Sequence, residues 1–379
     1  MNDTVKPKLV ILNDFFYPAY KAGGPIQSLV NLIVLLENDY EIYVVTAARD
    51  LNEITPMQVK LNQWSELLLP SSKEKINIWY SDNNKIKKIL NGIIVDINPS
   101  AVYLNGMYSF SYVILPILYL KNIKIVICPR GMIQQGALSG KYLKKVTFLT
   151  LLKSTGLLKN VWWHATSKIE QHDIKRIFGK KSNIILAGNV PKALFKNIIP
   201  CEKRKNELRL VYISLITSKK NLLLSIEAII KSDKNITLDI FGPIKDVDYW
   251  KKCEALILKS NGKIKYIGDL VPEKVQETFC KYDAGLFLTK AENFGHALYE
   301  SLSCARPIIT SNFTPWRNLE SQFAGWNVDI SDLNVVLRKL NIIADMDNAQ
   351  FENYCKGAYN LAMHYYENGV IKNEYQKLF

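Results

Sequence analysis

The sequence predicts an α/β protein of two domains, each built on a doubly wound parallel sheet. Its 379 residues are too many for one ordinary core and suit two domains of about 170 to 190 residues. Short apolar runs typical of buried strands alternate with stretches of helical period along most of the chain. Several of these runs end in polar, glycine-containing turns, which is where such sheets bind ligands.

The composition indicates a globular protein with an anionic partner. The chain is 48% hydrophobic and 22% charged, which is typical of a folded globular protein. Its formal net charge of +14 indicates an anionic partner, such as a nucleotide diphosphate, an anionic membrane surface or nucleic acid. The basic residues are spread along the chain and no nucleic-acid-binding signature is present, which argues against nucleic acid. Six scattered cysteines and four histidines without metal-ligand spacing favour reduced thiols and argue against zinc.

Hydropathy gives an expectation for location. The longest apolar run, residues 113–120, is interrupted by Pro116 and falls well short of the roughly 20 residues of a membrane span. The N-terminus lacks an apolar signal region. We therefore expect a cytoplasmic protein, with peripheral contact to the inner face of the plasma membrane as an open alternative.

The first domain begins with a short buried strand and a glycine loop. Residues 8–12 form the expected strand, and a helical period starts at Ile26. Between them lie Gly23 and Gly24, which would let the backbone approach a ligand closely. Asn105 directly follows one later strand and Arg130 lies three residues after the end of another, so both are expected at the ligand-binding edge of the sheet. The further predicted strands are 41–46, 93–96, 101–104, 123–127, 161–165 and 183–186.

One basic stretch of the first domain has two interpretations. Residues 141–163 combine lysines with leucines, phenylalanine and tryptophan. This pattern fits a helix on an anionic membrane, or a core helix with a solvated lysine face followed by a buried strand. Ser167 followed by Glu170 fits a capping box with a structural role. The lysine-rich residues 191–209 have no clear period and are expected to link the domains.

The second domain carries the most informative stretch. A buried strand at 284–288 leads into a turn with Glu292 and Gly295, then a helix at 291–304 with Glu300, and Pro307 precedes another strand. The start of such a helix offers free N–H groups and partial positive charge to a phosphate. The two glutamates are acceptors only, so they suit the hydroxyl donors of a sugar and a ribose. The other expected strands are 210–214, 236–241 and 264–267, and helices follow from 335.

Glu292 and Glu300 are separated by seven residues, and Asn293-Phe294-Gly295 directly follows the first. This pattern resembles the Glu-x7-Glu signature of the retaining glycosyltransferases of family 4, which have the two-domain GT-B fold. The resemblance implies two Rossmann-like domains facing across a cleft. It assigns residues 1–195 to the acceptor domain, 208–352 to the nucleotide-sugar domain and 353–379 to a helix that crosses back.

The resemblance also implies an activity and site residues. The activity is transfer of a sugar, with retention, from a nucleoside-diphosphate sugar (UDP-sugar favoured) to a glycan or lipid-linked acceptor in surface-polysaccharide or lipopolysaccharide assembly. The implied catalytic residues are Glu292, Lys220 and Arg130. The implied donor-binding residues are Gly23, Gly24, Lys219, Leu270, Val271, Asn293, Phe294, Gly295, His296, Ala297 and Glu300. The sugar or acceptor pocket is assigned to Asn105, Thr314, Trp316 and Arg317, although Trp316 fits packing equally well. No metal or other cofactor is expected.

Three positions depart from the family pattern. Arg130 stands where many members carry a histidine, Leu215 stands in place of the arginine that grips the diphosphate, and Ala305 replaces a helix-ending glycine. The loss of one cation at Leu215 leaves an inactive sugar-nucleotide binder as an alternative. A sugar-nucleotide epimerase or hydrolase of the same fold is another. If the chain is left-handed at Ala305, the cost is on the order of 1 kcal/mol.

Overall fold

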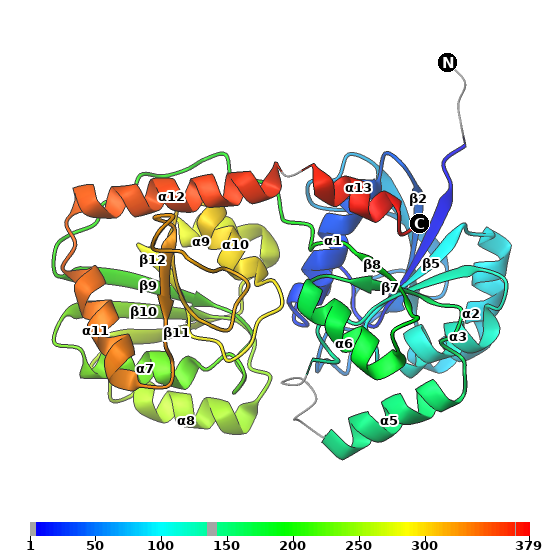
Figure 1. The fold of residues 1–379 in the computed structure, drawn as a ribbon, viewed down its shortest axis with the longest axis horizontal. Helices are drawn as coiled ribbons and strands as arrows, with labels where there is room; N and C mark the ends of the chain where they lie inside the picture. The colour runs from blue at the N-terminus through cyan, green and yellow to red at the C-terminus, as the bar shows by residue number, and fades with distance from the viewer. Residues whose placement is uncertain (1–4, 135–141, 368) are drawn as a thin grey trace. The chain divides into compact units, whose positions relative to one another are not determined.

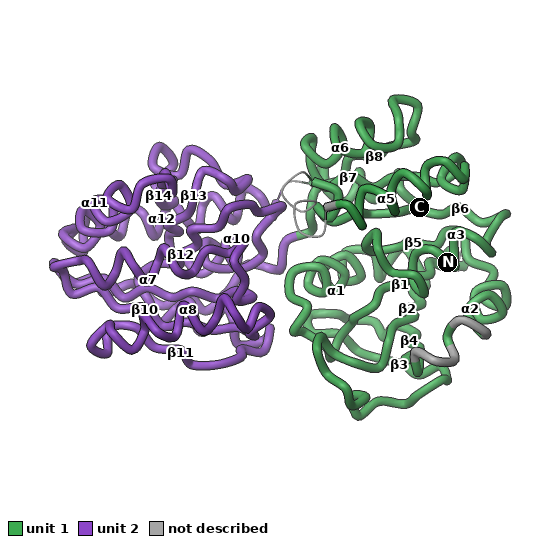
Figure 2. The backbone as a smooth tube through the Cα atoms, turned by 90° about the horizontal axis from the view of Figure 1, so that it is seen from below, with its two compact units in different colours: residues 1–190, 369–379 green, residues 191–368 purple. Residues whose placement is uncertain are grey.

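The computed structural model describes residues 5–134, 142–367 and 369–379. The chain divides into two compact units, shown in Figure 2. Unit 1 comprises Met1–Val190 and Gly369–Phe379, and unit 2 comprises Pro191–Asn368. Unit 2 is therefore an insertion in the sequence of unit 1. The segment 353–379, expected to be a single returning helix, is divided, because residues up to 368 belong to unit 2.

Unit 1 contains an eight-stranded sheet in the order β3-β4-β2-β1-β5-β6-β7-β8. The pair β3–β4 is antiparallel and the other neighbours are parallel. The predicted strands at 8–12, 41–46, 101–104, 123–127, 161–165 and 183–186 are confirmed to within a residue or two. The strands are β1 (Lys8–Asn13), β2 (Glu41–Ala47), β3 (Trp64–Leu68), β4 (Lys75–Ser81), β5 (Ala101–Asn105), β6 (Lys124–Cys128), β7 (Trp162–Ala165) and β8 (Asn183–Leu186).

The predicted strand at 93–96 is wrong. These residues end helix α2 (Asn83–Ile97). Ile86, Leu90, Ile93, Ile94 and Ile97 are all buried, with the spacing of one helical face. The short run from Ile93 reads as a strand only when it is separated from this longer period.

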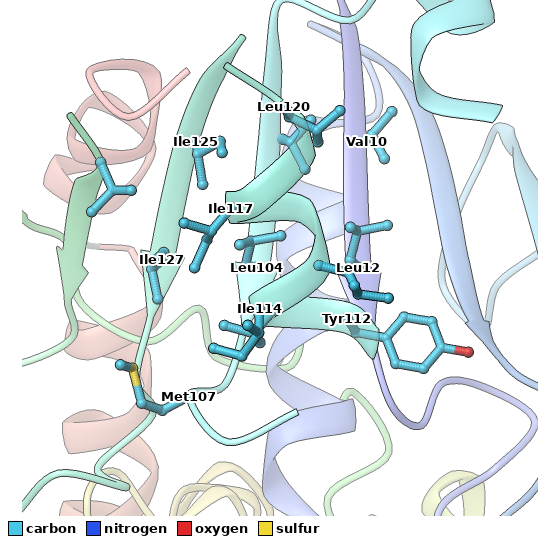
Figure 3. Close-up of a cluster of buried hydrophobic side chains, with 14 of the residues drawn as sticks. Val10, Leu12, Leu104, Met107, Tyr112, Ile114, Ile117, Leu120, Ile125 and Ile127 are labelled. Atoms are coloured by element: carbon cyan, nitrogen blue, oxygen red, sulfur yellow. The ribbon is translucent and has the colours of Figure 1, made fainter. Parts of the chain in front are cut away.

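Helices cover both faces of the first sheet (Figure 1). Along β1 the side chains alternate between two buried clusters, one with Val10 and Leu12 and the other with Leu9 and Ile11. Figure 3 shows the first cluster, in which β1, β5 and β6 pack with Ile114 and Ile117. The elements are α1 (Gly24–Leu36), a π-helical turn (Phe110–Ile114), α3 (Leu115–Tyr119), α5 (Tyr142–Ser154), α6 (Lys168–Phe178) and α13 (Val370–Gln376).

Unit 2 contains a six-stranded parallel sheet in the order β11-β10-β9-β12-β13-β14. Numbered within the unit, this is 3-2-1-4-5-6, the order of the Rossmann fold. The predicted strands of this half are confirmed. The strands are β9 (Glu207–Ile213), β10 (Asn235–Phe241), β11 (Ile264–Gly268), β12 (Ala284–Phe287), β13 (Ile308–Ser311) and β14 (Gly325–Val328).

Helices also cover both faces of the second sheet (Figure 1). Leu210 and Tyr212 of β9 enter the cluster that contains residues of α7, α8 and α11, whereas Val211 and Ile213 enter the cluster with α9, α10 and α12. The elements are α7 (Leu222–Lys231), α8 (Val247–Ile257), a 3₁₀ turn η2 (Pro272–Lys274), α9 (Val275–Phe279), α10 (His296–Ser303), α11 (Leu333–Ala344) and α12 (Asn348–Tyr366).

Helix α10 is shorter than predicted and ends in a strained residue. It begins at His296 and not at 291, because Gly295 adopts a left-handed conformation before it. After the helix, Ala305 has φ 55°. The backbone there is therefore left-handed, and the cost expected for this case applies. In the described part of the chain, no helix is long and apolar enough to cross a membrane.

Candidate active site

The candidate donor site of unit 2 lies where its strand order reverses. Strands β9 and β12 are parallel neighbours although they lie some seventy residues apart in sequence, with Ala284 opposite Leu210. The loops that follow them, at 214–221 and 288–295, therefore leave the same edge of the sheet side by side. Ligands of doubly wound sheets bind at this switch point. The topology thus brings together the loop of Lys220 and the loop of Glu292.

The loop that contains Lys220 is hydrogen-bonded to the segment that follows β12. The amide of Asn221 donates to the carbonyl oxygen of Leu288 at 3.0 Å, and Lys290 N donates to the carbonyl oxygen of Lys219 at 2.9 Å. Asn221 has φ 58°, a left-handed conformation that asparagine tolerates better than most residues. These contacts fix the backbone on both sides of Lys220, so the direction of its side chain is defined by the sheet edge.

Lys220 forms an ion pair with Glu292, in which the ammonium group donates to Oε2. The two side chains are 24% and 14% exposed, so the pair is largely shielded from water. The other carboxylate oxygen, Oε1, accepts from Asn293 N at 3.2 Å. Burial raises the pKa of Glu292, but Lys220, Lys219 and the Asn293 amide outweigh it and hold the pKa below its usual value. Glu292 is therefore a carboxylate at neutral pH.

Gly295 starts α10 and fits its position for two reasons. Its φ of 80° and ψ of 73° are left-handed, which favours glycine. A Cβ atom there would lie 2.9 Å from Leu298 Cδ1 and 3.1 Å from Glu292 Cγ. The first N–H groups of the helix, at His296 and Ala297, have no acceptor within the helix and give its start anion-binding character. Glycine thus allows the Glu292 side chain to lie against the helix start.

Glu300 lies in α10, one turn further along, and is 5% exposed. Its Oε2 is 3.5 Å from the ammonium nitrogen of Lys192, which also donates to the carbonyl oxygen of Pro272 at 2.9 Å. Burial raises the pKa of Glu300, and Lys192 opposes that rise. Leu270, partly buried, and Val271, 43% exposed, immediately precede Pro272.

The residues expected in a sugar pocket differ in accessibility. Trp316 is 6% exposed and donates through its indole nitrogen to the carbonyl oxygen of Phe294 at 2.7 Å. Its ring lies 5.6 Å from that of Phe294 and 5.5 Å from that of Tyr365. Thr314 is also buried, and its hydroxyl donates to the carbonyl oxygen of Trp316 at 3.3 Å. These positions favour the packing interpretation for Trp316, while Arg317 is exposed.

The switch point of unit 1 lies between β1 and β5 and gathers a second polar group. Asn105, at the end of β5, donates to the side-chain oxygen of Asn13 at 3.4 Å. The next residue, Asp14, accepts from the Ser109 hydroxyl at 2.7 Å. Burial raises the pKa of Asp14, and the Ser109 hydrogen bond opposes this. The site contains amide, hydroxyl and carboxylate groups within one small area of the sheet edge.

Arg130 is placed in this second group by an unusual local fold. It has φ 53°, and its guanidinium donates to Asn105 Oδ1 at 2.7 Å, Asn189 Oδ1 at 2.8 Å and Tyr103 Oη at 3.1 Å. All three acceptors are neutral side-chain oxygens. The guanidinium thus joins β5 to the segment that follows β8, and Arg130 is partly buried.

The hydrogen bonds continue inward to a buried histidine. Tyr103 Oη lies 2.8 Å from His164 Nδ1, and His164 Nε2 lies 2.8 Å from the carbonyl oxygen of Ala187. Because a carbonyl only accepts, Nε2 carries the proton and Nδ1 accepts from Tyr103. Burial, together with Arg130, lowers the pKa of His164 to about 3. The imidazole is therefore neutral and serves as a fixed acceptor.

The glycine loop of unit 1 is held by a carboxylate that the sequence did not reveal. Asp50 accepts from Tyr20 N at 2.9 Å and from Lys21 N at 3.1 Å. This fixes the backbone directly before Gly23, which has φ 76°, and Gly24, the first residue of α1. A carboxylate thirty residues away gives no local sequence signal.

Two further residues were missed or misassigned. Ser167 caps α6 as predicted, but the side chain of Glu170 accepts from Gly131 N and Thr166 N and so holds the loop of Arg130. Arg306 is 1% exposed and donates to the carbonyl oxygens of five residues. These are Tyr282, Cys304, Ala305, Ile199 and Cys280.

Comparison with known proteins gives a family match for part of the chain and shows its fold. Residues 196–350 match the family model for glycosyl transferases group 1. No curated protein matches the chain in sequence. Sucrose-phosphate synthase from Thermosynechococcus elongatus is similar in structure, with a TM-score of 0.75, 14% identity and 98% of each chain covered. Alr3699/HepE of Anabaena, solved with UDP and glucose, has a TM-score of 0.69, 12% identity and 98% of each chain covered.

A third structure, WaaG, is described as a glycosyltransferase involved in lipopolysaccharide biosynthesis. It has a TM-score of 0.65 and 12% identity over 97% of this chain and 98% of its own. These likenesses confirm the predicted fold: the chain has the GT-B fold of two parallel-sheet α/β domains. The matched segment lies in unit 2, whose switch point carries Lys220 and Glu292.

Proposed function

We propose that this protein is a retaining glycosyltransferase that uses a nucleoside-diphosphate sugar, with a UDP-sugar favoured. The observation that carries the proposal is the shielded pair of Lys220 and Glu292 at the start of α10, within the segment that matches glycosyl transferases group 1. The UDP and glucose bound to Alr3699/HepE support the choice of a UDP-sugar.

The diphosphate is assigned to the start of α10. The ammonium group of Lys220 and the N–H groups of Gly295, His296 and Ala297 supply positive charge and donors for its oxygens. Glu292 forms an ion pair with Lys220. A bound diphosphate takes over as the partner of the ammonium group, and Glu292 becomes available to sugar hydroxyls. With these groups present, no metal ion is required to hold the leaving group.

The reaction is a front-face displacement. The bond between the anomeric carbon and the phosphate oxygen breaks, the acceptor oxygen forms its bond on the same face, and the acceptor proton passes to the leaving phosphate. The positive charge at the start of α10 stabilises the departing diphosphate, and the Glu292 carboxylate lies beside the sugar with oxocarbenium character. Because Leu215 replaces one cation of the family pattern, Lys219 is assigned as a second cation, supported by its electrostatic effect on Glu292.

The acceptor is assigned to unit 1 and is a glycan or a lipid-linked saccharide. Asn105, Asp14 and Ser109 present the mixed donors and acceptors that bind hydroxyl groups. Arg130 adds a partly buried cation, which suits a phosphate or an acidic sugar on the acceptor. Arginine does not exchange protons near neutral pH, so its role is binding and not proton transfer.

Helix α5 is the proposed contact with an anionic membrane that holds such an acceptor, with the protein acting from the cytoplasm. Leu149 and Leu152 are buried in the core, but Leu143 and Leu151 are 78% and 63% exposed. Lys144 and Lys153 of the helix are exposed too, whereas Lys145 is partly buried and Lys141 lies outside the described residues. Exposed leucine beside lysine suits the surface of an anionic bilayer. Sedimentation with phosphatidylglycerol vesicles, compared with phosphatidylcholine vesicles, tests this contact.

The central test is turnover of variants at the donor site. Glu292→Ala and Lys220→Ala are each expected to lower turnover at least tenfold without changing the unfolding midpoint much. Lys259→Ala, at an exposed lysine after α8, is the control. The donor is first identified by thermal shift with UDP-, GDP-, ADP- and dTDP-sugars. Normal turnover in both variants would refute the assignment, and product formed without acceptor would indicate an epimerase or hydrolase instead.

A further inference from the structure

Lys192 lies in the segment where the chain enters unit 2, far in sequence from every motif of the donor site. Its ammonium nitrogen is 2.9 Å from the carbonyl oxygen of Pro272 and 3.5 Å from Glu300 Oε2. The side chains of Lys192 and Glu300 are only 17% and 6% exposed. A lysine with so little exposure is uncommon unless it has a partner, and here the partner is Glu300.

The two groups that Lys192 contacts are the expected walls of the nucleoside site. Glu300 is assigned to the ribose, and Pro272 directly follows the loop of Leu270 and Val271 that is assigned to the base. The ammonium group therefore lies between Glu300, assigned to the ribose, and the loop assigned to the base. Its distance of 3.5 Å from Oε2 is long for a charged hydrogen bond, so Oε2 retains capacity to accept from a ligand.

We propose that Lys192 is a positioning residue of the nucleoside site, which holds Glu300 as an ionised, oriented acceptor for the ribose hydroxyls of the nucleotide. The inference rests on the proposed function and assigns a role to a residue outside the family motifs. The ammonium group supplies the countercharge that a buried carboxylate needs, and a protonated Glu300 would accept fewer hydrogen bonds from a ribose.

The other ionisable groups near Glu300 do not supply that charge. Tyr299 of α10 and Cys304, which follows the helix, interact with Glu300, and burial raises the pKa of both far above neutrality. Tyr365 and Tyr366 of α12 act on Tyr299. Cys280, at the end of α9, contacts Cys304. Lys192 is the cation that lowers the pKa of Glu300, against the rise caused by burial.

The first measurement is the affinity for UDP across pH, by calorimetry on the full chain. Lys192→Met should weaken UDP binding about tenfold near pH 7, which corresponds to about 1.4 kcal/mol. The loss should shrink as the pH rises, because Glu300 then ionises without help. Lys192→Arg should retain most of the affinity. Lys196→Met, at an exposed lysine of the same segment, should bind as the wild type does.

Two further variants separate charge from structure. Lys192→Gln retains a donor for the Pro272 carbonyl oxygen but no charge, so it should show the same pH dependence as Lys192→Met. If Lys192→Met does not fold, this variant carries the test. In a Glu300→Gln background, Lys192→Met should cause little further loss, since its target is already neutral.

The outcomes distinguish this inference from the proposed function. If the wild type binds no UDP-, GDP-, ADP- or dTDP-nucleotide, the proposed function fails. If UDP binds and Glu300→Gln weakens it, but the Lys192 variants bind normally at every pH, the inference alone is overturned. Independent, additive losses from Lys192→Met and Glu300→Gln would overturn it too, because they would place Lys192 outside the action of Glu300.

Discussion

Replacing Gly295 by alanine tests the geometry of the helix start that carries the donor site. The left-handed backbone alone costs an alanine about 1–2 kcal/mol. The new Cβ would also lie 2.9 Å from Leu298 Cδ1, and Leu298 is 3% exposed and cannot move away freely. Overpacking of this kind adds about 1–3 kcal/mol. We therefore expect Gly295→Ala to lower the free energy of unfolding by about 2–5 kcal/mol.

The same change should also reduce turnover. The Cβ would lie 3.1 Å from Glu292 Cγ, so the carboxylate must shift by a few tenths of an ångström from its place beside Lys220. Misplacement of a catalytic group by about 1 Å costs roughly a hundredfold in rate, so a loss of about tenfold is expected here. Urea unfolding followed by tryptophan fluorescence and a radiolabelled transfer assay measure the two effects.

Gly262→Ala is the matched control. Gly262 has the same φ of 80°, but a Cβ there meets nothing within 4 Å. It should lose only the backbone contribution of about 1–2 kcal/mol and keep full turnover. Equal losses of stability in the two variants, with normal turnover in both, would refute the reasoning, because they would show that the contacts with Leu298 and Glu292 place no constraint on residue 295.

Two predictions concern stability. Arg306→Met should lower the free energy of unfolding by about 3–5 kcal/mol, because five carbonyl oxygens lose their donor, three of them in buried hydrogen bonds. Arg317→Met, at an exposed arginine, should change it by less than about 0.5 kcal/mol in the same urea titration, and similar values would contradict this account. The buried His164 has a pKa of about 3 in the folded protein and about 6.5 when unfolded, so the unfolded chain binds the extra proton between these values. Stability should therefore be complete above about pH 6.5 and fall as the pH is lowered towards 4, and His164→Gln should reduce this slope.

Local patterns predicted the fold well, because buried runs and helical periods depend on residues that are close together in the sequence. The failure at 93–96 arose where three apolar residues at the end of α2 were separated from their helix. The edge pair β3–β4 was missed because Trp64–Leu68 is partly exposed and lacks a clear apolar run. Strands of this kind depend on pairing with a neighbour, which sequence alone does not show.

The sequence predicted the motif residues of the candidate site, but not the side chains that contact them. Lys220 and Glu292 were assigned separately, and their meeting follows from the adjacency of β9 and β12. Glu170 illustrates the limit, because its spacing from Ser167 predicted a local cap whereas its side chain reaches Gly131. Contacts between the ends of neighbouring strands join residues that are distant in sequence, and Lys192 was missed for the same reason.

The division of unit 1 by the sequence of unit 2 has a consequence for synthesis. Tyr375 and Leu378, in the final segment, are fully buried in the core of unit 1 alongside Leu9 and Ile11. On the ribosome, the core of unit 1 therefore stays incomplete until residues 369–379, which follow unit 2 in the sequence, have been made. Unit 2 completes its own sheet earlier, so a nascent chain passes through a stage in which the later half is finished and the earlier half is still open.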